Sequence, residues 1–487
     1  MITRRAALAA PVALAAALGG LVTSASAVVP PYEPVSTDDP LVVADVTDAW
    51  LYGLEVGPRA ITWGGETPVP EPGPDDGPGV KAEVPFGSVA HSRLYTPDLG
   101  KTPLTLGAEI TPPIVETINP ATTEEWAVGF DPYDGEGGYV LRVRHKSGAV
   151  ATIPMPWDLS MGTGWVSVWG DTALVGQYLV DLATLDVADL REVGPEGCFF
   201  GERAVLADGL LLVRDVCAEA VVATEVPADG MSVTDLEDAT WEPVMDGVPD
   251  LMAYSRGLLV FAAGDVFGYH RIDEPGAEAW TSTAPVSIRA LRVQGQRYVV
   301  AFDAGFVVFE EGSEEPVAGI SRGDIGRASV AETAVPRDDS GDSNLDGYLV
   351  DLYGRTLVWV DGTDLVAATL PPLAGGAVTS DSAASATVGT AVQVTASGLQ
   401  PGEEVAVWLE SDPVLLALGY ATADGTFSGS VTLPAATAPG AHTLTVQGVE
   451  SGWSSADPIT VAAAGGSGTG SGSGSSGNRG LAVDTGR

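Results

Sequence analysis

The sequence predicts a protein built almost entirely of β-strands, and three observations support this fold class. The 487 residues include 61 glycines and 35 prolines, spread along the chain, which leave little room for long helices. Short apolar runs recur, for example at residues 138–143, 257–261 and 297–302, and turn sequences such as Asp208-Gly209 separate them. Hydrophobic residues make up 45% and charged residues 18% of the chain, a composition typical of folded globular domains.

Residues 1–27 have the pattern of a cleaved export signal. Two arginines precede an apolar stretch over residues 6–22, and residues 25–27 (Ala-Ser-Ala) form the small-x-small pattern of a signal peptidase site. Proline and glycine interrupt the apolar stretch, which disfavours a membrane anchor. We expect export by the general secretory or the twin-arginine route, and a linker over residues 28–39 at the start of the mature chain.

Residues 40–372 contain a repeated unit of strand, turn, strand and polar connection. The units are spaced by about 37 to 47 residues and begin near Trp165, Ala204, Leu251, Ile288 and Ile325. This period is typical of the four-stranded blades of a β-propeller, in which each blade covers the apolar face of the next. The sequence predicts a propeller of about seven blades, with a β-sandwich array or a β-helix as alternatives.

The two cysteines flank a predicted hairpin. Residues 199–205 and 210–216 are strand-like, and Asp208-Gly209 lies between them as a turn. Folding of this hairpin brings Cys198 opposite Cys217, so we expect a disulfide in an oxidising compartment, worth ~3 kcal/mol. A reactive thiol pair is the alternative, but no His or Lys lies nearby in the sequence to lower a thiol pKa.

A second domain is predicted over residues 384–464, after a small and polar linker at 373–383. Apolar and polar residues alternate in several short runs, as they do in the strands of a two-sided β-sandwich. Residues 398–405 (GLQPGEEV) resemble the G-x-x-P-G-E-x-V turn of bacterial surface Ig-like modules, and residues 424–427 (DGTF) also match. The resemblance implies an Ig-like sandwich that acts as a stalk or spacer and has no catalytic residues.

Residues 465–487 are predicted to be a disordered spacer. The segment 465–477 contains only glycine, serine and one threonine, so it has no apolar side chain to bury. Residues 478–487 resemble the segment before the anchor in secreted proteins of high-GC Gram-positive bacteria, with an imperfect match to an L-A-x-T-G sortase signal. We expect no transmembrane helix in the mature chain, because no other stretch approaches 18 apolar residues.

One acidic motif suggests a metal site. Asp342, Asn344 and Asp346 fit the pattern D-x-[DN]-x-[DN]-G, in which alternate oxygen ligands on a tight loop bind Ca²⁺. The next ligand position holds Val350, and Asp351 follows one residue later. A plain acidic turn is the alternative to Ca²⁺, which is the only cofactor that we predict.

Other candidate residues give weaker indications. Residues 322–324 form an Arg-Gly-Asp tripeptide, and the four histidines are scattered without metal-ligand spacing. The candidates for stacking on sugar rings, with packing in a core as the alternative, are Trp126, Trp165, Trp169 and Trp241. No catalytic motif is recognisable, and 65 acidic residues are too many for a catalytic pair to be selected from sequence.

The charge balance restricts the possible partners. The formal net charge is −42, which excludes nucleic acid and anionic membranes as favoured partners and favours a soluble monomer. We expect an extracellular, secreted or cell-surface protein whose propeller face binds carbohydrate or protein, with the Ig-like domain as a stalk. The alternatives are an extracellular polysaccharide hydrolase with acidic residues in the propeller channel, and a structural envelope protein.

Overall fold

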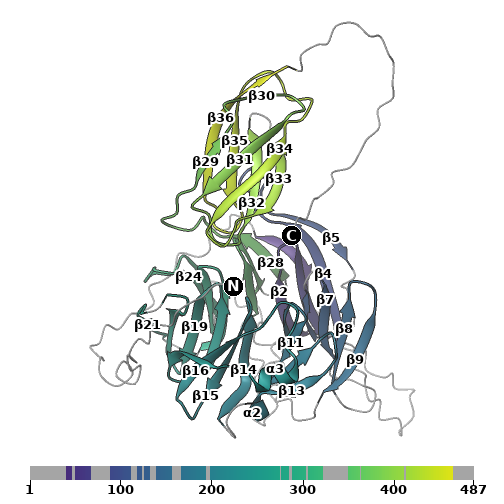
Figure 1. Cartoon of the computed structure of the whole chain (residues 1–487), viewed down its shortest axis with the longest axis vertical. Helices are drawn as coiled ribbons and strands as arrows, with labels where there is room; N and C mark the ends of the chain where they lie inside the picture. Colours follow the sequence, from purple (N-terminus) through teal and green to yellow (C-terminus); the bar gives the residue numbers. More distant parts are fainter. Residues whose placement is uncertain are drawn as a thin grey trace.

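The computed structural model describes residues 40–46, 50–66, 88–110, 118–122, 125–131, 139–155, 166–193, 198–274, 276–284, 288–302, 305–321, 349–361, 364–410 and 413–463. Apart from two short helices, the regular structure of these residues is β-strand. The strands form a ring of sheets with a smaller sandwich seated on it (Figure 1). The predicted all-β fold class is therefore confirmed.

Seven antiparallel sheets of four strands make up the ring in the described residues, which is the architecture of a β-propeller. We number the sheets as blades 1 to 7 in chain order. The first three blades consist of β2 (Trp50–Val56), β3 (Ala60–Glu66), β4 (Ser88–Thr96) and β5 (Thr105–Ile110); β6 (Ile118–Thr122), β7 (Trp126–Asp131), β8 (Tyr139–His145) and β9 (Val150–Met155); and β10 (Val166–Trp169), β11 (Thr172–Val175), β12 (Tyr178–Asp181) and β13 (Val187–Asp189).

The next three blades repeat the same up-and-down order. They consist of β14 (Phe199–Ala207), β15 (Leu210–Asp215), β16 (Ala220–Glu225) and β17 (Glu242–Asp246); β18 (Leu251–Ser255), β19 (Leu258–Ala263), β20 (Val266–Arg271) and β21 (Trp280–Thr283); and β22 (Ile288–Gln294), β23 (Arg297–Phe302), β24 (Gly305–Glu310) and β25 (Ala318–Ser321).

Blade 7 closes the ring with strands from both ends of the domain. Its sheet contains β26 (Val350–Tyr353), β27 (Thr356–Asp361) and β28 (Asp364–Thr369), and β1 (Leu41–Asp45) pairs with β28 as the fourth strand. The first strand of the domain therefore joins the blade that ends it, which holds the two ends of the ring together.

Apolar side chains between neighbouring blades stabilise the ring. Leu258 and Val260 of blade 5, for example, pack with Tyr298 and Val300 of blade 6, and all four are buried. Similar clusters join blades 2 and 3, 3 and 4, 4 and 5, 6 and 7, and 7 and 1. Central strands are thus buried on both faces, which explains why their sequences are nearly continuous apolar runs rather than alternating ones.

Two single-turn helices lie in the connections of the ring. α2 (Leu190–Val193) follows β13, and α3 (Val233–Glu237) lies between β16 and β17. A capping box begins α3, because Ser232 Oγ accepts from the backbone N–H of Asp235 while Asp235 Oδ2 accepts from the N–H of Ser232.

The second domain, which we call the module, is a β-sandwich of two sheets. The three-stranded sheet contains β29 (Thr379–Ser382), β31 (Ala391–Ser397) and β34 (Thr426–Thr432) in that order. The five-stranded sheet has the order β30 (Ser385–Thr387), β36 (Ser454–Ala462), β35 (Gly440–Gly448), β32 (Glu404–Glu410) and β33 (Val414–Tyr420). Residues such as Val394, Val407 and Leu444 fill the core between the sheets.

The module begins earlier than the sequence predicted. The predicted linker 373–383 contains β29, which pairs with β31 from Thr379↔Ser397 to Ser382↔Val394. The prediction of a linker was wrong at this point because β29 consists of small polar residues with no apolar alternation, so its composition resembles that of a loop.

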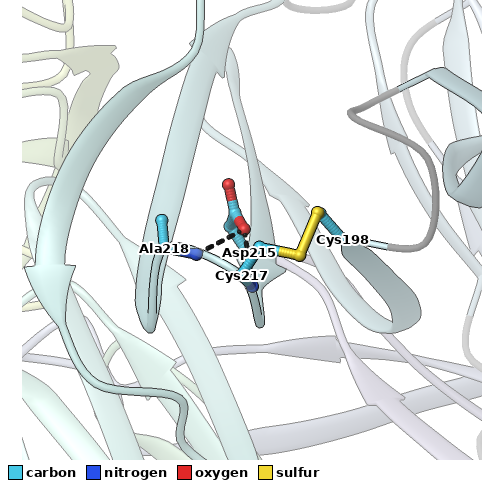
Figure 2. The surroundings of a disulfide bond; sticks show 4 residues. All are labelled: Cys198, Asp215, Cys217 and Ala218. Carbon is cyan, nitrogen blue, oxygen red and sulfur yellow. Dashed lines mark hydrogen bonds between the residues drawn. A yellow bond between two sulfur atoms is a disulfide. The ribbon is translucent and has the colours of Figure 1, made fainter.

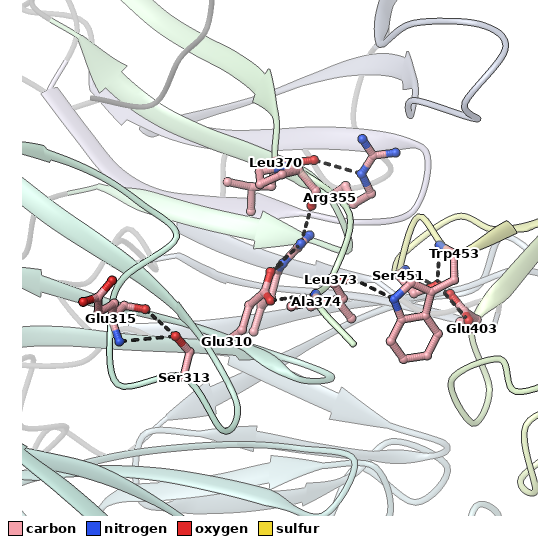
Figure 3. Close-up of polar contacts among 12 residues, drawn as sticks. Glu310, Ser313, Glu315, Arg355, Leu370, Leu373, Ala374, Glu403, Ser451 and Trp453 are labelled. Atoms are coloured by element: carbon pink, nitrogen blue, oxygen red, sulfur yellow. Dashed lines mark hydrogen bonds and ion pairs between the residues drawn. The ribbon is translucent and has the colours of Figure 1, made fainter. Parts of the chain in front are cut away.

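The segment that joins the two domains is held by both of them (Figure 3). On the propeller side, Arg355 Nε donates to the carbonyl of Leu370 at 2.8 Å, and the N–H of Ala374 donates to Glu310 Oε2 at 3.0 Å. On the module side, Trp453 Nε1 donates to the carbonyl of Leu373 at 2.8 Å. The connection is therefore a fixed part of the structure.

Several predictions concern residues outside the described ranges. The predicted signal peptide and linker over residues 1–39, and the predicted spacer over 465–487, both lie there. Among the described residues, no helix has the length and apolar character needed to cross a membrane.

Candidate functional site

The first strand of each blade lies innermost, around the propeller axis. These seven strands, β2, β6, β10, β14, β18, β22 and β26, contact one another in that order, and β26 also contacts β2. A closed ring of backbone therefore surrounds the axis, and charged residues on neighbouring innermost strands come close together.

Three charged side chains from this ring form what we call the axial cluster: Glu55 of β2, Arg292 of β22 and Asp351 of β26. Arg292 Nε lies 3.7 Å from Asp351 Oδ1, and the backbone N–H of Val56 donates to Asp351 Oδ2 at 2.7 Å. Asp351 therefore joins blades 6, 7 and 1. The side chains of Arg292 and Asp351 are only 19% and 14% exposed, so little solvent reaches this pair.

Burial changes the proton affinities of all three groups. Burial and, to a smaller extent, the charge of Asp351 raise the pKa of Glu55 to about 8. Burial raises the pKa of Asp351 to about 6, although Arg292 and the N–H groups of Val56 and Leu352 oppose the rise. Burial lowers the pKa of Arg292 to about 10. At neutral pH we expect a protonated Glu55 beside an ionised Asp351–Arg292 pair.

This arrangement places a proton donor and a carboxylate in one half-buried cluster. Two carboxyl groups whose pKa values are separated by their environments are the usual arrangement for general acid and base chemistry. Buried ion pairs also occur as structural elements of a fold, and the hydrogen bond from Val56 gives Asp351 such a role here.

The turns after the innermost strands face the module, and we call this side of the propeller the turn face. Arg256, in the turn after β18, pairs with Glu450 of the module, with Nη1 2.8 Å from Oε2. Arg59, in the turn after β2, forms an ion pair with Glu404. Gly354, after β26, leaves no room for a side chain, since an added Cβ would lie 2.9 Å from Cα of Glu450.

The module thus rests on blades 5, 6, 7 and 1 at the turn face. Leu99, in the turn between β4 and β5, packs with Ala406 and Trp408 of the module, and neighbouring Lys101 Nζ lies 2.9 Å from Glu410 Oε1. Figure 1 shows the module beside β28, β2 and β24, while blades 3 and 4 lie far from it. The module therefore lies against the propeller, whereas the family resemblance implied a stalk or spacer.

The glutamate of the GLQPGEEV motif has a structural role inside the module. Glu403 is fully buried, and its Oε1 accepts from the N–H of Gln400 at 2.6 Å, while its Oε2 accepts from the N–H of Ser451 at 3.0 Å. Figure 3 shows Glu403 with Ser451 and Trp453. The motif therefore fixes the loops that face the propeller, and burial raises the pKa of Glu403.

The predicted disulfide between Cys198 and Cys217 is present in blade 4 (Figure 2). Its Cα atoms are 5.1 Å apart across the ends of β14 and β15, and the turn at Asp208-Gly209 has positive φ angles of 49° and 79°. Asp215 Oδ1 accepts from the N–H groups of Cys217 and Ala218, which fixes the residues after β15. The hairpin and its disulfide are confirmed.

Several of the other predicted site residues lie outside the part of the chain that the structure describes. Asp342, Asn344 and Asp346 lie outside the described residues, as do the tripeptide at 322–324 and Trp165. The Ca²⁺ site therefore stays a prediction.

The remaining aromatic candidates pack against other side chains. The ring of Trp126 lies 4.6 Å from that of His145, and its Nε1 donates to Asp171 Oδ1 at 2.6 Å. Trp241 packs edge-on against Phe199 at 4.8 Å, and Trp169 belongs to the same apolar cluster. These three tryptophans therefore pack against neighbouring side chains, which was the alternative to stacking on sugar rings.

Comparisons with known proteins support the domain architecture. Residues 374–461 match the family model of the macroglobulin-like domain. No curated protein matches the chain significantly. Among solved structures, the chain is similar to Hsv2 of Kluyveromyces lactis, with 9% identity, coverage of 79% of this chain and 100% of that chain, and a TM-score of 0.38.

A second similar structure is a quinonprotein alcohol dehydrogenase-like protein of Bacteroides thetaiotaomicron. The identity is 11%, the coverage is 57% of this chain and 67% of that chain, and the TM-score is 0.35. Scores at this level carry no argument about function, and the propeller assignment rests on the strand order described above.

Sequence reasoning did not select the axial cluster, although a signal was present. Glu55 and Asp351 each interrupt an otherwise apolar strand, in the sequences WLYGLEV and VDLY, while Arg292 lies in IRALRVQ, which also contains Arg289 and Gln294. A charge inside a strand that is buried on both faces requires a partner. That pattern would have singled out these strands, but not which of them meet at the axis.

Proposed function

We propose that this is an exported, extracellular protein whose propeller displays a binding face for carbohydrate or protein. The observation that carries the proposal is the position of the module, which occupies the turn face over blades 5, 6, 7 and 1. The opposite side, which we call the open face, is left for a ligand. A disulfide and an Ig-type domain favour an oxidising, extracellular location.

The two longest connections of the domain, residues 67–87 and 322–348, join strand ends that lie on the open face. Long connections positioned by a rigid scaffold are where binding residues are concentrated. The module, held rigidly at the opposite side, would keep this face directed away from whatever its C-terminal end is attached to.

Binding assays on paired surface variants test the assignment of the face. The mature protein, residues 28–487, is incubated with a panel of cell-wall and environmental polysaccharides and with extracellular proteins, and retention is measured. Val216→Arg alters the open face beside the disulfide, and Leu185→Arg alters the turn face of blade 3; the two side chains are 41% and 37% exposed. We expect loss of retention only with Val216→Arg, whereas loss only with Leu185→Arg would move the binding site to the turn face.

A second candidate function is hydrolysis of a polysaccharide, favoured by the axial cluster. In this case Glu55 gives its proton to the leaving oxygen, and Asp351 takes a proton from the water that attacks the anomeric carbon. Mass spectrometry of the same incubations distinguishes the two functions, because only hydrolysis releases oligosaccharides. Release that is abolished by Glu55→Gln would support hydrolysis, while retention without products would favour the binding protein.

A further inference from the structure

Strand β33 is an unprotected sheet edge. It is the outer strand of the five-stranded sheet and pairs with β32 on one side, and among the described residues no strand pairs with its other side. Its sequence, VLLALGY, contains neither a charge nor a proline. Edge strands of natural proteins usually carry such residues or are covered, since free backbone N–H and C=O groups attract another strand.

The exposed side chains of β33 extend an apolar surface at the junction of the two domains. Leu418 pairs with Ala406, and Leu415 pairs with Trp408, so both leucines lie on the side of the sheet that faces the propeller. Ala406 and Trp408 are buried against Leu99, but Leu415 and Leu418 are 37% and 43% exposed. Trp408 Nε1 is buried without a hydrogen-bond partner.

The charges around β33 indicate what kind of strand would pair with it. Asp412 precedes the strand and Asp424 follows it, and residues 374–463 contain no Lys or Arg. Carboxylates of the module that lie at the propeller form ion pairs with basic residues of the propeller, as Glu410 does with Lys101. A second copy of β33 would bring like charges together. The edge therefore suits an extended segment with an apolar centre and basic ends.

The chain contains a segment of this kind within reach. Residues 479–487 (RGLAVDTGR) have apolar residues at Leu481, Ala482 and Val483, followed by Asp484, and an arginine at each end, so their side chains carry a net positive charge. The last strand, β36, ends at Ala462, and the slot beyond β33 lies four strand positions away, about 19 Å. A glycine- and serine-rich connection of about 16 residues spans roughly 22 Å on average, which matches this distance.

We propose that residues 479–487 add to the free edge of β33 as a further strand of the module, within the same molecule. The backbone of the segment pairs with the outer side of β33, and its apolar centre covers Leu415 and Leu418. The two arginines lie toward the acidic ends of the slot. Because the connection holds the segment at an effective concentration in the millimolar range, weak intrinsic affinity is sufficient.

Hydrogen exchange on the β33 amides tests this proposal. The mature protein, residues 28–487, is compared with a form that ends at Gly477 and keeps every described residue. We expect exchange at least about tenfold slower in the longer form, at all protein concentrations. A synthetic peptide of residues 478–487 should restore slow exchange to the shorter form in a saturable manner.

A pair of variants separates strand addition from a general effect of the tail. Leu481→Asp with Val483→Asp should raise the exchange rate to that of the shorter form, whereas Ser475→Asp with Ser476→Asp, which adds the same charge to the spacer, should leave exchange slow. Equal exchange in the longer and shorter forms would overturn the proposal. So would protection that persists without the tail and rises with protein concentration, since a second copy would then be the occupant.

Discussion

At the scale of single residues, Glu55 makes the stability of the folded protein depend on pH. Its pKa is raised from 4.5 to about 8 in the folded protein, so the folded state binds this proton more tightly than the unfolded chain does. The stabilising effect of the bound proton is fully present below pH 4.5. It is lost as the pH rises through about 8, at up to about 1.4 kcal/mol per pH unit.

We therefore predict that Glu55→Gln changes the pH dependence of stability. The glutamine has no proton to lose, so the variant should gain stability relative to the unaltered protein between pH 5 and pH 9. Thermal unfolding across this range measures the effect, with the exposed Glu109→Gln as control. A difference in melting temperature between the two forms that stays the same at every pH would contradict the raised pKa of Glu55.

The Ca²⁺ hypothesis is a prediction at the same scale. If Asp342, Asn344 and Asp346 hold a cation, excess Ca²⁺ should raise the melting temperature of the mature protein relative to chelator, because a ligand that binds only the folded state stabilises it. Asp342→Asn with Asp346→Asn should remove the difference, and Glu314→Gln with Glu315→Gln, at exposed positions after β24, provides a control with the same change of charge. An equal melting temperature with Ca²⁺ and with chelator would leave the motif as a plain acidic turn.

At the scale of elements, the segment between the domains depends on a buried ion pair. Arg297 and Glu310 are 2% and 5% exposed, with Nη2 2.9 Å from Oε1, and each also bonds the segment, Arg297 at the carbonyl of Pro371 and Glu310 at the N–H of Ala374. The pair therefore fixes the last propeller residues to the start of the module.

Glu310→Ala should destabilise the propeller by about 3–5 kcal/mol, because it leaves the Arg297 guanidinium buried without its carboxylate. Urea unfolding measures the loss, and Glu315→Ala, at an exposed position in the following turn, serves as the control. The double variant Arg297→Met with Glu310→Leu should lose much less, since it removes both charges. A single-variant loss below about 1 kcal/mol would show that the pair contributes little.

The elements also show what sequence reasoning captures. The spacing of the repeats predicted the propeller, and the hairpin around Asp208-Gly209 predicted the disulfide, because both depend on local patterns of about 20 to 40 residues. The closing strand β1 and the strand β29 were not predicted. β1 pairs with residues more than 300 positions away, and β29 is a strand of small polar residues whose pairing depends on the sheet that it joins.

The axial cluster and the interface between the domains could not be predicted for the same reason. Glu55 meets Asp351, and Arg59 meets Glu404, only after the ring has closed and the module has docked. Each residue in isolation is one charge in a chain with 65 acidic residues. Their pairing follows from which innermost strands become neighbours, and that is a property of the whole topology.

At the scale of the whole molecule, the carboxylates of the acidic module form ion pairs with Lys and Arg side chains of the propeller. Residues 374–463 contain no Lys or Arg, and Glu404, Glu410 and Glu450 pair with propeller residues. Glu450 is the most deeply placed of these contacts, with a side chain only 4% exposed beside Arg256. The two domains should therefore unfold together, because separating them would leave these carboxylates without their counter-charges.

Charge reversal at Glu450 tests this coupling. We expect the mature protein to unfold in a single calorimetric transition. Glu450→Arg places two cations together at the interface and should split this transition into two. The free energy that docks the module on the propeller should fall by about 3–5 kcal/mol. Adding Arg256→Glu to that variant restores an opposite pair and should restore one transition, whereas Asp381→Arg, at an exposed position of β29, should leave the single transition unchanged. Two separate transitions in the unaltered protein would show that the module folds independently and that these ion pairs do not couple the two domains.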